Sequence, residues 1–274
     1  MAFSMRFWGV RGSISCPSPQ YMTYGGNTSC VEILAGDQRI ILDGGTGIRG
    51  LGRSLLREDA RSAVILFSHT HWDHINGFPF FEPAYRPGRT FRILGGHLSD
   101  AGGIRAALAG QMTQPMFPVP LDVMRADMVF EDFRAGDRFS LAGGVSVSTA
   151  PLNHPNGATG YRLERGGKSL CYVTDHEHVA GRPDAGLLAL IEGADVVVYD
   201  CTYDEETYAA HAGWGHSTWE EGVRLCRRAG ARKLLIFHHD PDNDDERMAA
   251  IEVKAGRAWD GALVAREGLS LHLA

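Results

Sequence analysis

The sequence predicts an α/β protein in which two mixed sheets carry helices on their outer sides. Three observations favour this fold class. Apolar runs of strand length recur along the 274 residues, helical patterns fall between them, and glycine pairs typical of turns separate many of the runs. No low-complexity linker or short repeat divides the chain. We therefore expect a single domain over residues 1–274.

The expected strands include several of the type buried on both faces. Residues 63–68 (AVILFS), 195–200 (DVVVYD) and 233–238 (KLLIFH) are nearly continuous apolar runs, which are typical of buried strands. A Gly-Gly turn between residues 158–164 and 168–174 predicts a hairpin. The remaining expected strands are 30–35, 38–43, 90–94, 123–130 and 145–152.

Helical patterns cover residues 47–57, 99–109, 184–192 and 218–229. The last pattern has the clearest start, because Ser217 followed by Glu220 predicts a capping box. Gly230 suits the end of the same helix. Trp219, Val223 and Cys226 would then share its buried face.

The composition indicates which classes of substrate and which cellular location fit this protein. The formal net charge is -6 and the sequence shows no basic stripe, so a small or locally charged substrate is favoured over a long nucleic acid. The five cysteines include no CxxC pair, which indicates reduced thiols and a cytoplasmic location. We expect neither a signal peptide nor a membrane span. The oligomeric state stays open, a homodimer included.

The segment Phe67-Ser-His-Thr-His-Trp-Asp-His74 carries most of the chemistry. It places His69, His71, Asp73 and His74 directly after a buried strand, where loops build sites. Imidazole is a common ligand of zinc and similar metals, and a carboxylate adds charge. The first two histidines can point the same way, and the last two side chains follow a bend. One loop could therefore serve two adjacent ions.

Four side chains cannot saturate two ions, so further ligands must come from other strand ends. The sequence offers His154, Asp175 and His238, each at the end of an expected strand. The two oxygens of Asp175 suit a bridging position. His239 competes with His238, because adjacent residues at a strand end point in opposite directions. We expect His238 to be the ligand.

The motif HTHWDH, followed in order by His154, Asp175 and His238, resembles the metallo-β-lactamase superfamily. The resemblance implies a four-layer αβ/βα sandwich with a dinuclear site at one edge of the sheets. It implies that His69, His71 and His154 hold one metal. It implies that Asp73, His74 and His238 hold the other, with Asp175 bridging. Asn27 and Asp43 would lie nearby, but Asp43-Gly-Gly is equally a tight turn, and we expect neither among the ligands.

The stretch Gly215-His-Ser-Thr218 resembles the phosphodiesterase branch of that superfamily, which includes tRNase Z and cyclic-nucleotide phosphodiesterases. The resemblance implies that His216 protonates the leaving oxygen. Asp200 is a candidate for orienting it or a ligand, and His176 is a candidate for substrate contact. tRNase Z carries a long arm between the counterparts of His154 and Asp175, whereas one hairpin fills that interval here.

We therefore expect a dinuclear-metal-dependent phosphodiesterase acting on cyclic nucleotides or short phosphodiesters. Attack by a metal-bridged hydroxide is expected, with Asp73 and His216 as the catalytic residues. Zinc is the default metal for a histidine-rich site, and manganese or iron stays open. The alternatives are a tRNase Z-like endoribonuclease, or a thioester, lactone or β-lactam hydrolase. The sequence leaves open whether residues 80–130 form a lid, an interface, or core and turns.

Overall fold

The computed structural model describes residues 3–98 and 102–273. In that part of the chain, two seven-stranded sheets face each other, with orders β14-β1-β2-β3-β4-β5-β6 and β13-β12-β11-β10-β9-β8-β7. The first sheet is antiparallel from β14 to β3 and parallel from β3 to β6. The second is antiparallel from β7 to β10 and parallel from β10 to β13.

The bounds of the elements are as follows. The strands of the first sheet are β1 (Phe3–Gly9), β2 (Cys30–Ala35), β3 (Gln38–Leu42), β4 (Ser62–Phe67), β5 (Thr90–Gly95), β6 (Asp127–Asp132) and β14 (Ser270–His272). Those of the second are β7 (Arg138–Leu141), β8 (Val145–Leu152), β9 (Ala158–Arg165), β10 (Lys168–Val173), β11 (Val196–Asp200), β12 (Leu234–Phe237) and β13 (Ala262–Val264). The α-helices are α1 (Gly47–Arg57), α2 (Trp72–Ile75), α3 (Gly103–Gln111), α4 (Ala185–Ile191), α5 (Glu205–Tyr208), α6 (Trp219–Arg228) and α7 (Asp245–Ala258).

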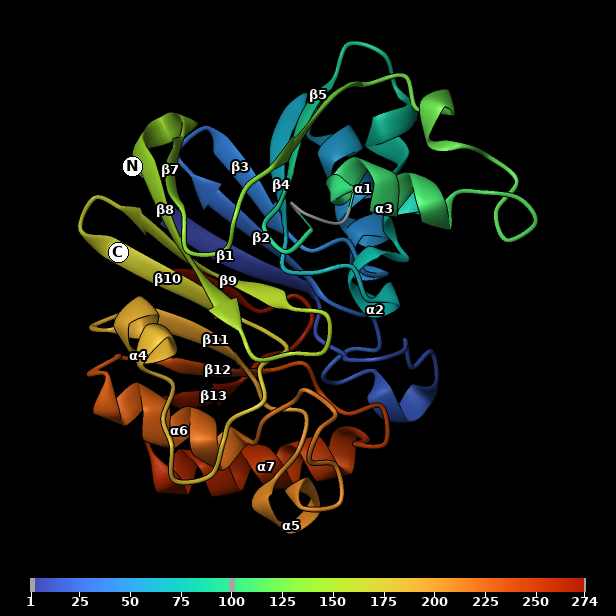
Figure 1. Cartoon of the computed structure of the whole chain (residues 1–274). Coiled ribbons are helices and arrows are strands. Elements are labelled where there is room, and N and C mark those ends of the chain that lie inside the picture. The colour runs from blue at the N-terminus through green and yellow to red at the C-terminus, as the bar shows by residue number, and fades with distance from the viewer. Residues whose placement is uncertain (1–2, 99–101, 274) are drawn as a thin grey trace.

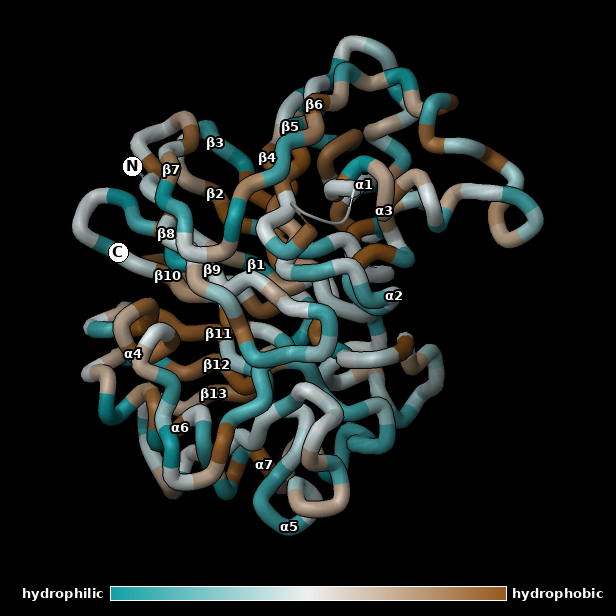
Figure 2. The backbone as a smooth tube through the Cα atoms, in the orientation of Figure 1, coloured by the Kyte–Doolittle hydropathy of each residue, from teal (hydrophilic) through white to brown (hydrophobic). Residues whose placement is uncertain are grey.

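Three hydrophobic clusters lie between the layers of sheets and helices. One lies between the sheets and includes Phe7, Leu66 and Tyr161. A second joins the outer face of the second sheet to α4, α6 and α7, and a third joins the first sheet to α1 and α3. Figure 1 shows these helices on opposite outer sides of the paired sheets, and Figure 2 shows the hydrophobic strands β11 to β13 between them. The expected α/β sandwich with helices outside is confirmed.

Several local predictions need correction. Residues 121–123 form a 3-10 turn and the strand runs over Asp127–Asp132, because Leu121 and Met124 turn inward to the core beneath α3. Residues 99–101 of the helix expected at 99–109 lie outside the described residues, and the described helix begins at Gly103. Residues 113–120, after this helix, extend away from the body (Figure 1).

The expected capping box of α6 is wrong by one residue. Thr218, not Ser217, is the N-cap, and its hydroxyl accepts the backbone N–H of Glu221. Ser217 is fully buried and its hydroxyl instead accepts from Tyr199. The predicted apolar face of this helix is confirmed, since Trp219, Val223 and Cys226 are buried.

The sequence patterns missed β1, the short edge strands β7, β13 and β14, and α7. An acidic run precedes and opens α7. Asp244 is the N-cap of this helix and accepts the N–H of Arg247, while Asp245 and Glu246 lie in its first turn. Acidic residues are favourable there because the helix dipole is positive at its N-terminus.

All five cysteines are free and buried, as expected. No helix in the described part of the chain is both long and apolar enough to cross a membrane.

Candidate metal centre

The polar residues singled out in the sequence meet at one edge of the two sheets. Strands β10, β11 and β12 are parallel neighbours, so their carboxyl ends lie together. Asp200 is the last residue of β11, Asp175 and His238 follow β10 and β12, and His154 follows β8. From the first sheet, the loop after β4 enters α2 with His71 as an extended N-cap. This turn directs the side chains of Asp73 and His74 inward, where both are buried.

A first group of potential ligand atoms brings together both sheets. Within it, all ligand atoms lie within 4.8 Å of one another: His69, His71, His154 and Asp175. His71 Nδ1 and His154 Nε2 are 3.0 Å apart. His69 Nε2 is buried without a hydrogen-bond partner, and Asp175 Oδ2 lies 3.5 Å from it.

A second group adjoins the first through Asp175. It consists of Asp73, His74, Asp175 and His238, all buried. His74 Nε2 lies 3.3 Å from His238 Nε2 and 3.2 Å from Asp73 Oδ2. Asp175 Oδ1 lies 3.2 Å from His74 Nε2. The other oxygen of Asp175 faces the first group, so this carboxylate lies between the two.

The structure separates the adjacent histidines at the end of β12. His238 Nε2 is 3.1 Å from Asp73 Oδ2, inside the second group. His239 points away, and its Nε2 donates to the carbonyl of Ala265 at 2.8 Å. Burial lowers the pKa of His239 to about 3, so its ring is neutral.

Hydrogen bonds hold the outer nitrogens of three of these rings. Asp43 Oδ2 accepts from His74 Nδ1 at 2.8 Å, and Thr202 Oγ1 lies 3.0 Å from His238 Nδ1. The carbonyl of Gly215 accepts from His154 Nδ1 at 2.7 Å. Such partners fix which nitrogen carries the proton and direct the other into the cluster.

The sequence patterns predicted neither Asp43 nor Thr202 as a hydrogen-bond partner of the clustered histidines. Asp43 is fully buried and also accepts from the backbone N–H of Ser68 and the hydroxyl of Tyr172. The signal for it was a carboxylate at the end of a buried strand. No local pattern points to Thr202. Its hydroxyl donates to a buried carboxylate, Asp200 Oδ1, at 2.8 Å.

The backbone is unusual at three of these positions. Asp43, Asp175 and His238 have φ values of 60°, 54° and 61°. Residues with side chains adopt this left-handed region only at a cost, and they concentrate at functional sites. Each lies within two residues of the end of a strand, so the conformation turns the side chain toward the cluster.

His216 lies beside both groups. Its ring is 5.3 Å from that of His154 and 4.9 Å from that of His238, and its side chain is 11% exposed. His216 Nδ1 donates to Asp200 Oδ2 at 2.9 Å. Burial opposes a charge on this ring, but Asp200, Asp175 and Asp73 outweigh it and raise the pKa of His216 to about 9.

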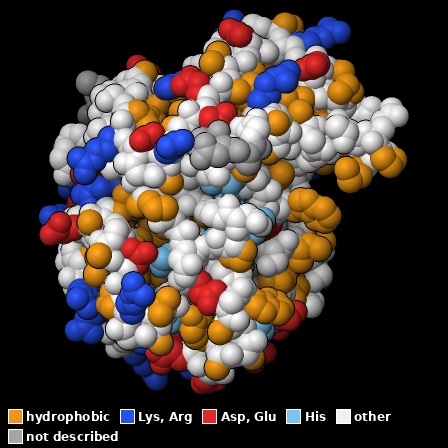
Figure 3. Space-filling view, in the orientation of Figure 1, with side chains coloured by type: hydrophobic (Ala, Val, Ile, Leu, Met, Phe, Trp, Pro, Cys, Tyr) orange, Lys and Arg blue, Asp and Glu red, His pale blue; other side chains and the backbone are white. Residues whose placement is uncertain are grey.

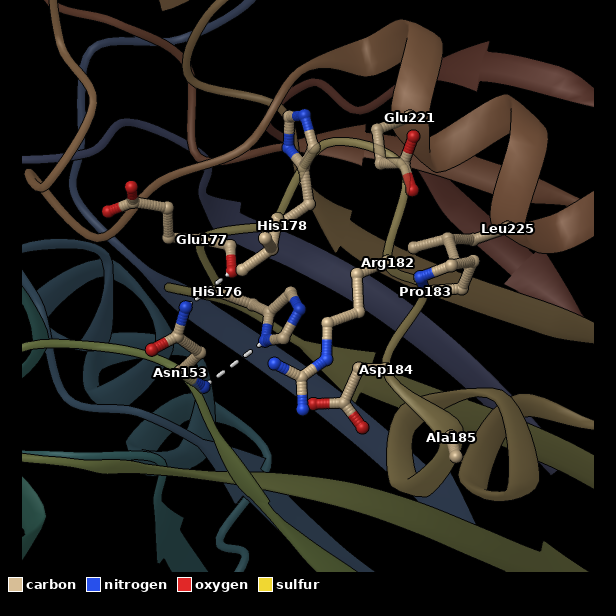
Figure 4. A pocket seen from close by; sticks show the side chains of 11 residues that line it. Asn153, His176, Glu177, His178, Arg182, Pro183, Asp184, Ala185, Glu221 and Leu225 are labelled. Carbon is tan, nitrogen blue, oxygen red and sulfur yellow. Dashed lines mark hydrogen bonds between the residues drawn. The ribbon is translucent and has the colours of Figure 1, made fainter.

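His176 does not join the cluster. Its Nδ1 accepts the backbone N–H of Asn153 at 3.2 Å. The ring lines a separate cavity of about 410 Å³ together with His178 and Arg182 (Figure 4). Histidine side chains are visible from outside near the middle of the face in Figure 3.

The donor set fits divalent metal ions. Burial lowers the pKa values of His69 and His154, which favours the neutral imidazole that binds metals. The Nε2 of His69 is buried without a hydrogen-bond partner, and nitrogens of different imidazole rings face each other across 3.0–3.3 Å. Imidazole nitrogen with carboxylate oxygen is the set that zinc, iron and manganese sites use.

Comparisons with known proteins show the family and the fold. The β-lactamase superfamily domain matches residues 38–239. A ribonuclease Z from Gemmatimonas aurantiaca is 24% identical over 90% of each chain. The metallo-β-lactamase fold protein YhfI from Bacillus subtilis has a TM-score of 0.75 at 17% identity, with 99% of each chain covered. A diphosphatase from the PhnP family has a TM-score of 0.70 at 18% identity, covering 98% of this chain and 97% of its own.

The fold, the order of the clustered residues and the matched domain all agree, so this chain belongs to the metallo-β-lactamase superfamily.

Proposed function

We propose that this protein is a phosphodiesterase that requires two divalent metal ions and cleaves cyclic nucleotides or short phosphodiesters. The observation that carries the proposal is the Asp200–His216 pair beside both groups of potential ligands. A thioester hydrolase needs no such acid, because a thiolate is a weaker base than an alkoxide and departs without prior protonation.

We assign the first ion to His69, His71 and His154 and the second to Asp73, His74 and His238. Asp175 is assigned to both ions, since its two oxygens face different groups. Two such ions lower the pKa of water and neutralise charge on phosphoryl oxygens. Zinc is the metal we favour, with manganese or iron as alternatives set by availability.

The chain's own residues supply the acid. Asp200 accepts from Nδ1 of His216 and favours the protonated ring, which leaves Nε2 to give its proton to the departing alkoxide. In the metal-free protein the neighbouring carboxylates raise the pKa of His216, which favours the protonated ring. Asp73 completes the catalytic assignment by holding the second ion next to His238.

A second candidate is endonucleolytic cleavage of RNA. It is favoured by the similarity to a protein named ribonuclease Z. Two features favour the small diester instead. The interval between His154 and Asp175 holds only the β9–β10 hairpin, and the net charge is -6. We also propose that residues 1–274 act as one domain, in the cytoplasm, with the free thiols reduced.

The test is hydrolysis by metal-loaded wild type and His216→Ala. Bis(p-nitrophenyl) phosphate, cyclic nucleotides, a precursor tRNA, a thioester and nitrocefin are assayed in parallel. We expect diester cleavage in the wild type and a loss in kcat of about 10²- to 10⁴-fold in the variant, with metal content unchanged. The surface variant His272→Ala is the control.

Activity on the thioester or nitrocefin alone, equal in His216→Ala and wild type, would overturn the phosphodiesterase assignment. Cleavage of the precursor tRNA without cleavage of small diesters would favour the ribonuclease instead.

A further inference from the structure

Glu177 is hydrogen-bonded to the loop that leads to His216. It lies two residues after Asp175, and its carboxylate accepts two backbone N–H groups. Oε1 accepts from Gly213 at 2.7 Å and Oε2 accepts from Gly215 at 2.7 Å. Figure 4 shows this carboxylate pointing away from Arg182 and the cavity between them. Glu177 therefore serves the loop rather than that cavity.

This loop, residues 213–215, contacts His154. The carbonyl of Gly215 accepts from His154 Nδ1, and the next residue is His216. The approach is close enough to require glycine. Gly215 has φ +88°, and a Cβ there would lie 2.3 Å from His154 Nδ1. The position of Gly215 thus decides the orientation of the imidazole of His154.

Glu177 is itself fixed to the segment that carries His154. Its backbone N–H donates to the carbonyl of Asn153 at 2.8 Å. The side-chain amide of Asn153 donates back to the carbonyl of Glu177 at 2.8 Å (Figure 4). The contacts close a ring that runs from Asn153 to His154, Gly215, Glu177 and back to Asn153.

We propose that Glu177 is a positioning residue that orients His154 toward its metal ion and holds His216 beside the site. This inference rests on the proposed metal centre. Glu177 belongs to neither group of potential ligands in the described residues, so it acts through its neighbours. Its carboxylate satisfies two backbone N–H groups that would otherwise need water, and loss of these two hydrogen bonds would release the Gly215 carbonyl.

The test compares Glu177→Gln with Asp245→Asn. Asp245 is a matched control, because its carboxylate also accepts two backbone N–H groups, those of Thr23 at 2.8 Å and Tyr24 at 3.1 Å. That loop supplies none of the potential ligands. Zinc binding is measured by competition with a chromogenic chelator, alongside thermal unfolding of the metal-free proteins and kcat on bis(p-nitrophenyl) phosphate.

We expect Glu177→Gln to lower the affinity for one of the two zinc ions by about 10- to 100-fold. Asp245→Asn should bind both zinc ions with the affinity of the wild type. Asn153→Ala, which loosens the same ring, should weaken that same ion by less and serves if Glu177→Gln does not fold. Equal zinc affinity in Glu177→Gln, Asn153→Ala and wild type would overturn the inference. Zinc affinity is read without turnover, so the inference survives or fails independently of the phosphodiesterase assignment.

Discussion

The two sheets contribute to the candidate centre in different ways. The first sheet delivers four clustered residues from one loop of six, His69 to His74, after β4. The second sheet delivers its residues singly, after β8, β10, β11 and β12. A single turn can be recognised from local sequence. Single residues become a site only because parallel strands end at the same edge.

The two groups assigned to metal ions do not follow the sheets. Each of these two draws residues from both sheets, and Asp175 lies between them. The centre therefore forms only when the two sheets pack face to face. Tyr161 illustrates how tightly they are joined at this edge, since its hydroxyl, from β9, donates to the carbonyl of Phe67 at the end of β4 at 2.6 Å.

The largest expected effect tests whether one ion is held by residues from both sheets. His71 and His154 come from different sheets, yet we expect His71→Ala and His154→Ala to lose the same ion. The double variant should then lose no more metal than either single one. His71→Ala combined with His238→Ala should lose both ions. Each single variant should lose at least about 10³-fold in diester hydrolysis, because an ion contributes several kcal/mol to the transition state.

Metal content per chain, measured by elemental analysis, checks this prediction. If the His71→Ala, His154→Ala double variant lost twice the metal of each single variant, the assignment of both residues to one ion would be wrong.

A smaller effect is expected from the carboxylate that supports the loop of the first sheet. Asp43→Asn keeps the shape but weakens acceptance from His74 Nδ1, Ser68 and Tyr172. Metal affinity should fall by about 10- to 100-fold, as for other partners of metal-binding histidines. Tyr172→Phe removes one donor and leaves the carboxylate, so we expect a smaller loss. Chelator competition measures both, and an unchanged affinity in Asp43→Asn would contradict this role.

The smallest expected effect concerns His239, the second of the two histidines that follow β12. The pKa of His239 falls from 6.5 to about 3 on folding, chiefly by burial. Between those values the unfolded chain binds a proton that the folded chain does not. The stability that the neutral ring contributes is thus present above pH 6.5 and is lost as the pH falls toward 3.

Urea unfolding of metal-free protein from pH 7 to pH 4 measures this contribution. The free energy of unfolding should fall less steeply with decreasing pH in His239→Gln than in wild type. Parallel curves for the two proteins would show that His239 titrates alike in both states.

Much of the fold was predictable, because apolar runs and glycine turns are local signals. The runs at 63–68, 158–164 and 168–174 lie within one residue of β4, β9 and β10. Short edge strands lacked such a signal. β13 and β14 have only three residues each and become strands through their neighbours β12 and β1. The acidic start of α7 is a local capping signal, although the sequence analysis did not predict this helix.

By itself the sequence determined the superfamily, the two-sheet class and the residue types that gather at the edge. Those follow from apolar patterning and from a compact histidine motif. Only the tertiary structure decided the choice of His238 over His239 and the partners Asp43, Thr202 and Glu177. The physical reason is chain separation. Asp73 and His238 meet across 165 residues, and their contact exists only once the two sheets have packed. Asp43 and His74 meet across 31 residues, and their hydrogen bond exists only once β3 and β4 have paired.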